Sequence, residues 1–522
     1  MKLKKQLDWS VLLISGGLLI LFILASFINP QLVNKLVNSS FNSSVKYFGA
    51  LWQILMLVTF VVAIGLSVSK LGQVRLGNLK HPEMSTFRWI AIIMCTLLAG
   101  GGVFWAAAEP IYHFISTPPV FNAINSKTPQ AVIPALSQSF MHWGFLAWSI
   151  LGTLSSIVLM YGHYTKGMPL KPRTLFYPIF GEKIMTKSIL GTLVDVFSVI
   201  AVAAGTIGPI GFLGLQASYG LESIFGIPDV YTTQLFIVFG LVTVAAISAA
   251  SGIDKGIQIL SRFNIILTLI LVILMLLLGP AGFIFDSFLG SIAVYFQDFL
   301  KLSLYRGNTT WLSSWTVFFW GWFIGYGPMM AIFISRISRG RTIRELVIAV
   351  SVISPLITNF WFTVIGGSGI FYELQKPGCI SEALNTSGMP AAMIAITKQL
   401  PMGTLMAAAF LFVTISFVAT TGDSMAYTIS IAITGDGNPP AGLRVFWAIV
   451  MGFVAAVLLS IGEESISSLQ SFIVVTAVPV SIILLPTVFL APKVARYMAK
   501  DQNILHEYEK ETSEQTLQGN AS

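Results

Sequence analysis

The chain has 522 residues, of which 55% are hydrophobic and only 10% are charged, and its formal net charge is +8. This composition excludes an ordinary soluble core and indicates a protein that crosses a lipid bilayer many times. The positive charge suggests a nucleic-acid partner at first sight. The basic residues lie between hydrophobic runs, however, so they report membrane topology and we expect no nucleic-acid binding.

Runs of about 20 apolar residues recur along the whole chain. The first begins after a basic N-terminus, lacks a small-residue cleavage site and extends to Pro30, so we interpret it as a spanning helix and not as a signal peptide. Most Lys and Arg residues lie on the inner side if both termini are cytoplasmic, as the positive-inside rule requires. The pattern predicts twelve spans, at 9–30, 49–70, 88–108, 136–162, 189–220, 231–250, 257–280, 311–335, 343–370, 400–430, 443–462 and 466–491.

Two of these spans contain Gly-rich interruptions. Ala99–Gly102 interrupts the third span, and Gly325–Pro328 interrupts the eighth. Interrupted helices at corresponding places in two halves are typical of transporters built from inverted repeats, with a binding site near the membrane midplane. We therefore predict that both helices are broken. Between the seventh and eighth spans, residues 285–305 mix apolar and charged side chains and predict an amphipathic helix at the outer surface.

The eighth span carries an aromatic stripe. Five aromatic residues fall on one face of a regular helix, namely Trp315, Phe319, Trp322, Phe323 and Tyr326. Ring faces attract positive charge, so this face suits a cation that has no hydrogen-bond donors. The alternative is an interfacial aromatic belt, but belts gather at helix ends, whereas this stripe continues for about three turns.

The residues after this stripe carry a family resemblance. The run Ser335–Glu345, SRISRGRTIRE, and the aromatic box before it resemble the eighth-helix signature of the betaine/choline/carnitine transporters. The runs His142–Leu151, Ser251–Gly256 and Phe417–Ser424 are similar to the family motifs HWxxxxWxxY, SGxxKG and FxxTSADS. The resemblance implies a secondary active transporter, not an enzyme, that imports a betaine-, choline- or carnitine-like quaternary-ammonium solute by alternating access.

The resemblance also implies an architecture. We expect an all-α polytopic protein of the bacterial cytoplasmic (inner) membrane, with twelve transmembrane helices and both termini cytoplasmic. Two inverted five-helix repeats form a LeuT-like core, two N-terminal helices precede it, and three copies form a homotrimer. The expected division is 1–87 for the N-terminal tail and two extra helices, 88–280 for the first repeat, 281–310 for the amphipathic helix, 311–491 for the second repeat and 492–522 for the cytoplasmic tail.

The substrate site is also implied by the resemblance. Trp143 and Trp148 are about 140° apart on a regular helix, so periodicity alone does not pair them, but the family pattern does. Phe323 stands where relatives have a second Trp, and Leu151 replaces a Tyr. The expected substrate-binding residues are Trp143, Trp148, Trp322, Phe323, Tyr326, Tyr112 and Trp315.

One sodium ion is implied in the tenth span. The resemblance places it between Thr420, Thr421, the Phe417 carbonyl and the broken third span near Cys95 and Leu98. Hydroxyl and carbonyl oxygens are the ligands that a hard cation prefers. A Thr pair in a membrane helix can instead bond only to carbonyls of its own helix. The second ion position of relatives falls on Val202, Thr206 and Met329, so we expect a single ion.

A sodium-independent antiporter of the same fold is the alternative. Asn264 stands where sodium-independent members have an arginine, which favours sodium coupling, whereas Met330 matches a methionine of those antiporters. Other classes fit less well. A channel would need a continuous polar lining, and an enzyme would need clustered acids or histidines inside spans. The five histidines lie at span ends or in loops, and Asp195 and Arg262 lie near span ends, so we expect no such cluster.

Overall fold

The computed structural model describes residues 7–98, 101–186, 188–251, 256–435, 437–460 and 465–504. These residues form α-helices joined by loops and by short 3₁₀ and π-helical segments, and no strand occurs among them. The prediction of an all-α polytopic membrane protein is therefore confirmed. The domain boundaries and the inverted repeats stay predictions.

Long helices alternate with short ones along the chain. The first half of the chain forms α1 (Trp9–Ile28), α2 (Pro30–Val68), α3 (Thr86–Leu98), α4 (Gly102–Ile115), α5 (Val132–Trp143), α6 (Phe145–Gly152), α7 (Leu154–Met160), α8 (Tyr177–Phe180), α9 (Ile189–Phe225), α10 (Tyr231–Ser251) and α11 (Gly256–Leu278). The second half forms α12 (Ala281–Gln297), α13 (Phe299–Ser303), α14 (Thr309–Ser314), α15 (Thr316–Ile337), α16 (Ile343–Ile348), α17 (Ser354–Phe362), α18 (Ser368–Gln375), α19 (Ser381–Ser387), α20 (Ala392–Lys398), α21 (Gly403–Thr434), α22 (Ala441–Leu459), α23 (Ser465–Leu484) and α24 (Thr487–Asp501).

Ten helices within the described residues are long and apolar enough to cross a membrane, or eleven if one bent pair counts as a single span. The bent pair contains the expected seventh span, and the other difference from the expected twelve arises in the third span. This span is divided into α3, which ends at Leu98, and α4, which begins at Gly102, and neither half is long enough alone. Gly101 has φ +149°, a conformation that favours glycine. The interruption in the third span is therefore present, although Ala99 and Gly100 lie outside the described residues, and the count of twelve stays a prediction.

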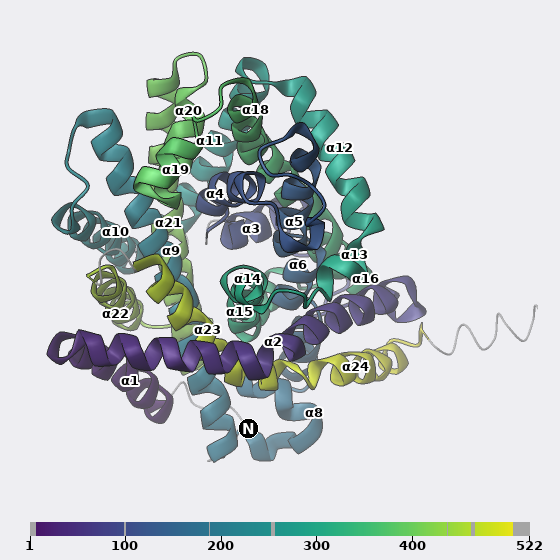
Figure 1. Cartoon of the computed structure of the whole chain (residues 1–522). Helices are drawn as coiled ribbons and strands as arrows, with labels where there is room; N and C mark the ends of the chain where they lie inside the picture. Colours follow the sequence, from purple (N-terminus) through teal and green to yellow (C-terminus); the bar gives the residue numbers. More distant parts are fainter. Residues whose placement is uncertain are drawn as a thin grey trace, which may run out of the picture.

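The predicted break in the eighth span was wrong. Helix α15 continues through Gly325–Pro328 to Ile337. Its glycines allow close packing and do not break the helix. A Cβ on Gly321 would lie 2.7 Å from Trp52 Cζ3, and one on Gly327 would lie 2.5 Å from Leu484 Cδ1. These contacts let α2 and α23 approach α15, which lies near the centre of the bundle beside α6, α9 and α23 (Figure 1).

The fourth span has a break that its sequence did not predict. Helix α5 ends at Trp143, Gly144 has φ −93° and ψ −139°, and α6 begins at Phe145. The freed Phe145 N–H donates to the Tyr295 hydroxyl, 3.3 Å away, so a side chain from α12 satisfies it. Helix α12 bends by 108° from the second part of α11 and packs along α5 (Figure 1). A helix in 285–305 is therefore confirmed, while its place at the outer surface stays a prediction.

The Gly321 contact makes a stability prediction. We expect Gly321→Ala to lower the stability of the purified protein by about 1–3 kcal/mol, because the fully buried Trp52 ring has to move. Thermal unfolding in detergent measures the loss. Gly65→Ala on α2 is the control, since its new Cβ would meet nothing within 4 Å. Equal stability of both variants would contradict this account of the α2–α15 contact.

Candidate functional site

Three aromatic side chains meet where α5 ends beside α15. The Trp143 ring lies edge-on to Trp322 and to Phe323, with centroid distances of 5.9 and 5.2 Å and interplanar angles of 83° and 78°. Trp322 and Phe323 are parallel to within 7° at 5.9 Å. All three side chains are at most 6% exposed. We call these three residues the ring cluster. The break at Gly144 places Trp143 at a helix end, which lets its indole turn toward α15.

Helix α9 fixes the orientation of Trp322. The Trp322 indole N–H donates to the Gly205 carbonyl at 3.0 Å. The Tyr326 ring packs over Gly205 so closely that an added Cβ would lie 2.3 Å from Tyr326 Cε2. The Tyr326 hydroxyl is 3.1 Å from Thr206 Oγ1, which donates to the Val202 carbonyl at 2.8 Å. Thr206, at the expected second ion position, is thus engaged with Tyr326 and with its own helix.

Of the remaining sequence-predicted aromatic residues, Trp315 and Tyr112 are linked to the ring cluster through other rings, whereas Trp148 is not, in the part of the chain that the structure describes. Trp315 packs on Tyr112 at 4.8 Å and on His113 at 4.5 Å, and Phe319 links it to Trp143 at 6.2 and 5.4 Å. Trp148 is buried on α6 but makes no ring pair with the cluster among the described residues. Sequence reasoning did not find Trp105 on α4 and Phe212 on α9, which pack on Phe319 and Trp322 at 4.9 and 6.1 Å.

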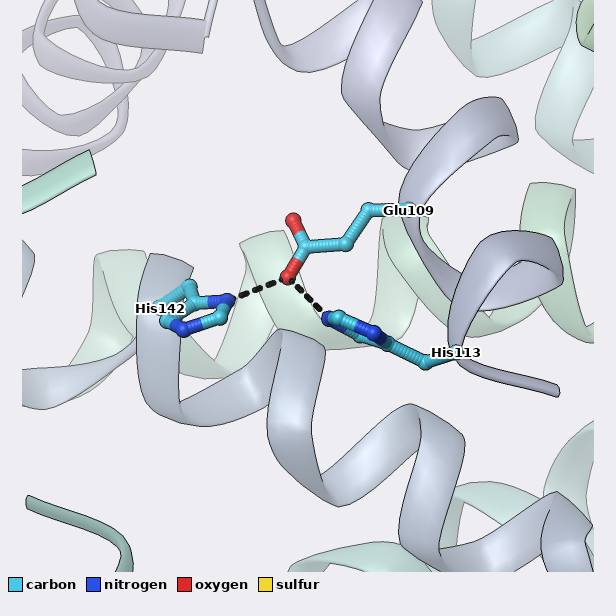
Figure 2. Close-up of side chains that lie close together, drawn as sticks. All are labelled: Glu109, His113 and His142. Carbon is cyan, nitrogen blue, oxygen red and sulfur yellow. Dashed lines mark hydrogen bonds and ion pairs between the residues drawn. The ribbon is translucent and has the colours of Figure 1, made fainter. Parts of the chain in front are cut away.

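The expectation of no acid–histidine cluster inside the spans was wrong. Glu109 on α4 accepts a hydrogen bond through Oε2 from the Trp143 indole at 2.9 Å. Its Oε1 lies 2.5 Å from His142 Nδ1 and 3.3 Å from His113 Nε2 (Figure 2). All three titratable side chains are fully buried. One signal was available: Glu109 and His113 are four residues apart, so they share a helix face.

The arrangement of this cluster is that of a hydrogen-bonded network. Its three ligand-type atoms lie within 4.8 Å of one another, a spacing that could admit a metal ion. The separation of 2.5 Å between Glu109 Oε1 and His142 Nδ1 is, however, a hydrogen-bond length, and it is too short for two ligands on one ion, whose bonds are about 2.0–2.1 Å each. His142 Nε2 is also engaged, at 2.9 Å from Thr316 Oγ1 and 3.2 Å from Gln138 Nε2.

The expected sodium site gathers buried oxygen atoms on α21 and α11. The Thr420 and Thr421 hydroxyls donate to the Ser416 and Phe417 carbonyls at 2.9 and 3.0 Å. Asn264 Nδ2 donates to Thr420 Oγ1 at 3.0 Å, and the Ser416 hydroxyl donates to Asn264 Oδ1. This set of hydroxyl, amide and carbonyl oxygens fits the preference of a hard cation. Helix α21 also contacts α3, but the side chains of Cys95 and Leu98 lie outside the described residues.

A buried ion pair lies two residues beyond these threonines. Asp423 Oδ1 is 2.9 Å from Arg444 Nη2, with both side chains 2% exposed. The Ser248 hydroxyl also donates to Asp423, and the Arg444 guanidinium lies over the Tyr427 ring at 5.2 Å. Asp423 was missed as a charged residue in the middle of a span. Asp195, expected near a span end, pairs with Arg173 Nε at 2.6 Å.

A buried aromatic cluster inside a many-helix membrane bundle, together with a buried set of hydroxyl, amide and carbonyl oxygens, is typical of a solute transporter. Comparison with known proteins agrees. The model of the betaine/carnitine/choline family transporters matches residues 10–500. The chain therefore belongs to this family, and it is a multi-pass membrane transporter, not an enzyme.

The similar proteins cover almost the whole chain. Glycine betaine transporter 2 of Vibrio parahaemolyticus is 54% identical over 500 residues, which are 96% of this chain and 92% of that protein. The ectoine/hydroxyectoine transporter of Virgibacillus pantothenticus is 31% identical over 488 residues, 92% and 95% of the two chains. The glycine betaine transporter OpuD of Bacillus subtilis is 31% identical over 487 residues, 91% of each chain.

The Asp423–Arg444 pair generates a prediction. We expect Arg444→Leu to destabilise the protein by about 3–5 kcal/mol, because it leaves the Asp423 carboxylate buried without its cation. The double variant with Asp423→Asn removes that charge and should recover part of the loss. Thermal unfolding of the two single variants and the double variant completes the cycle. Strictly additive losses would show that the pair is not coupled.

Proposed function

We propose that this protein is a secondary active transporter that imports a quaternary-ammonium solute of the glycine betaine type, coupled to one sodium ion, by alternating access. The observation that carries the substrate class is the ring cluster of Trp143, Trp322 and Phe323, buried where α5 meets α15. The glycine betaine transporters among its relatives, one of them 54% identical, support betaine ahead of choline or carnitine.

The chemistry of the substrate head explains why rings suit it. A trimethylammonium group has no N–H to donate, so a carboxylate in direct contact would offer only Coulomb attraction and would have to lose its own hydration. Ring faces attract the charge at small desolvation cost, with about 0.5–2 kcal/mol for each ring. Trp322 and Phe323 present parallel faces, and Trp143 stands edge-on to both, so the three rings form two walls at nearly a right angle.

The sodium proposal rests on the oxygen set around Thr420. Thr420, Thr421, Ser416, Asn264 and the Phe417 carbonyl would hold the ion. When bound, the ion would supply a positive charge that attracts these oxygens. Asn264 supports sodium over the exchanger alternative because its neutral amide contacts Thr420 directly, where an arginine would bring its own positive charge.

The assembly and the orientation belong to the same proposal. We place the protein in the bacterial cytoplasmic membrane with both termini cytoplasmic, on the basis of its Lys and Arg distribution. A homotrimer is proposed on the family resemblance alone. Cross-linking in native membranes tests the oligomeric state. Cross-linked products no larger than a monomer or a dimer would contradict the trimer.

The substrate proposal makes a binding prediction. Trp322→Leu should weaken glycine betaine binding about tenfold or more, because it removes one desolvated cation–π contact of about 1–2 kcal/mol. Isothermal titration of the purified protein measures the change. Trp447→Leu, which removes a buried indole on α22, controls for general loosening of the bundle. Unchanged affinity in Trp322→Leu, together with binding by the unaltered protein, would place the head elsewhere.

The sodium proposal makes a transport prediction. Uptake of betaine into proteoliposomes should depend on sodium with a Hill coefficient of about one, as expected for a single ion site. Thr420→Ala combined with Thr421→Ala removes two oxygen ligands and should raise the sodium concentration needed for half-maximal uptake at least tenfold, for a loss of about 1.4 kcal/mol or more. Thr414→Ala is the matched control, because this buried threonine of α21 also bonds to its own helix, at Phe410 O. Exchange that proceeds in potassium buffer without sodium would favour the antiporter.

A further inference from the structure

We propose that Glu109 is the fixed counter-charge of the quaternary-ammonium site and that it acts on the substrate head through the indole of Trp143. This inference rests on the proposed function, because it assumes that the ring cluster binds a cationic head. It adds a specificity-determining role for a residue that touches no substrate: Glu109 would favour a cationic head over a neutral head of the same shape.

The hydrogen-bond donors around Glu109 assign its charge. An indole nitrogen and the Gln138 amide nitrogen can only donate. His142 Nε2 faces that amide nitrogen at 3.2 Å, so it accepts, and the ring proton of neutral His142 lies on Nδ1, which then donates to Glu109. His113 Nε2 lies 3.3 Å from the same carboxylate oxygen. Glu109 thus accepts an N–H bond from Trp143 on Oε2 and one from His142 on Oε1, so the carboxylate needs no proton of its own. Figure 2 shows the two histidines converging on Oε1.

The negative charge of Glu109 is directed at the ring cluster. Within the part of the chain that the structure describes, no Lys or Arg forms an ion pair with Glu109. Its Oε2 instead ends on the Trp143 indole nitrogen at 2.9 Å. A carboxylate that accepts an N–H bond pushes electron density into the donor, and in a low-dielectric interior this polarisation is strong. The face of Trp143 therefore becomes more negative and binds a cation more tightly.

The indirect arrangement has a physical advantage over direct contact. A carboxylate in direct contact with the head would have no partner whenever the site is empty, and an unpartnered buried charge is costly. Behind the indole, Glu109 keeps its Trp143 and His142 donors whether the site is filled or empty. His142 also reaches Thr316 at the start of α15, so the same network joins α4 and α5 to the helix that carries Trp322.

A ligand pair tests the charge directly. Glycine betaine and 3,3-dimethylbutyrate share one shape and one carboxylate, and they differ in having a cationic nitrogen or a neutral carbon at the head. In the full-length protein, Glu109→Gln keeps an oxygen that can accept from Trp143 but removes the charge. We expect it to weaken betaine binding about tenfold, the size of one cation–π contact, and to leave dimethylbutyrate binding unchanged. Glu373→Gln is the control, since this buried carboxylate bonds to Ser381 and to backbone N–H groups of its own loop.

The outcomes separate the possibilities. Equal weakening of both ligands would overturn the inference and leave Glu109 a structural role, and so would unchanged betaine binding. Where dimethylbutyrate binds too weakly to titrate, a double-mutant cycle with Trp143→Phe decides. If Glu109→Gln still weakens betaine binding in the Trp143→Phe background, the charge does not act through the indole. If that effect disappears in this background, transmission through the indole is supported. Absence of betaine binding by the unaltered protein would instead refute the proposed function itself.

Discussion

Hydrocarbon offers no hydrogen-bond partner, so a polar group inside a membrane bundle is stabilised by a partner within the protein. The three polar groups nearest the candidate sites obey this constraint, and each joins different helices. Glu109 ties α4 to α5, Asn264 ties α11 to α21, and Asp423 ties α21 to α22. The first of these ties fixes a ring of the candidate site. Trp143 in particular stands where it does because its indole nitrogen has one strong acceptor, on a neighbouring helix.

Close packing around α15 also positions the rings of the candidate site. Helix α15 has neighbours on several sides, and at Gly321 and Gly327 the absence of a Cβ lets Trp52 and Leu484 come within reach of its backbone. These close contacts hold α15 in the orientation that places Trp322 and Phe323 beside Trp143. The rings of the candidate site are therefore also core side chains, and site geometry and fold stability depend on the same contacts.

The sequence predicts much of this structure because membrane spans and aromatic stripes are local patterns. The all-α class, the interruption in the third span and the meeting of Trp143 with Trp322 and Phe323 could be foreseen from motifs. The continuity of α15 could not, because Gly and Pro suggest a break in isolation, and only the packing partners show why glycine is needed. The Glu109 network was also hidden, since its three residues lie in two separate spans and resemble ordinary polar residues at span ends.

The two cations of the proposed mechanism require opposite chemistry, and the buried carboxylates are arranged accordingly. Sodium needs direct oxygen ligands, whereas a quaternary head cannot use them. Glu109 lies beside the rings, but the Trp143 indole and the two histidines contact its oxygens, so it would attract an organic cation at a distance without offering a free ligand to sodium. Asp423 lies close to the threonine pair, but Arg444 and Ser248 occupy it, which leaves neutral oxygens to hold the ion. In the proposed mechanism, the partners of these two carboxylates would keep sodium out of the aromatic site, and they would leave the sodium site with neutral ligands that can release the ion.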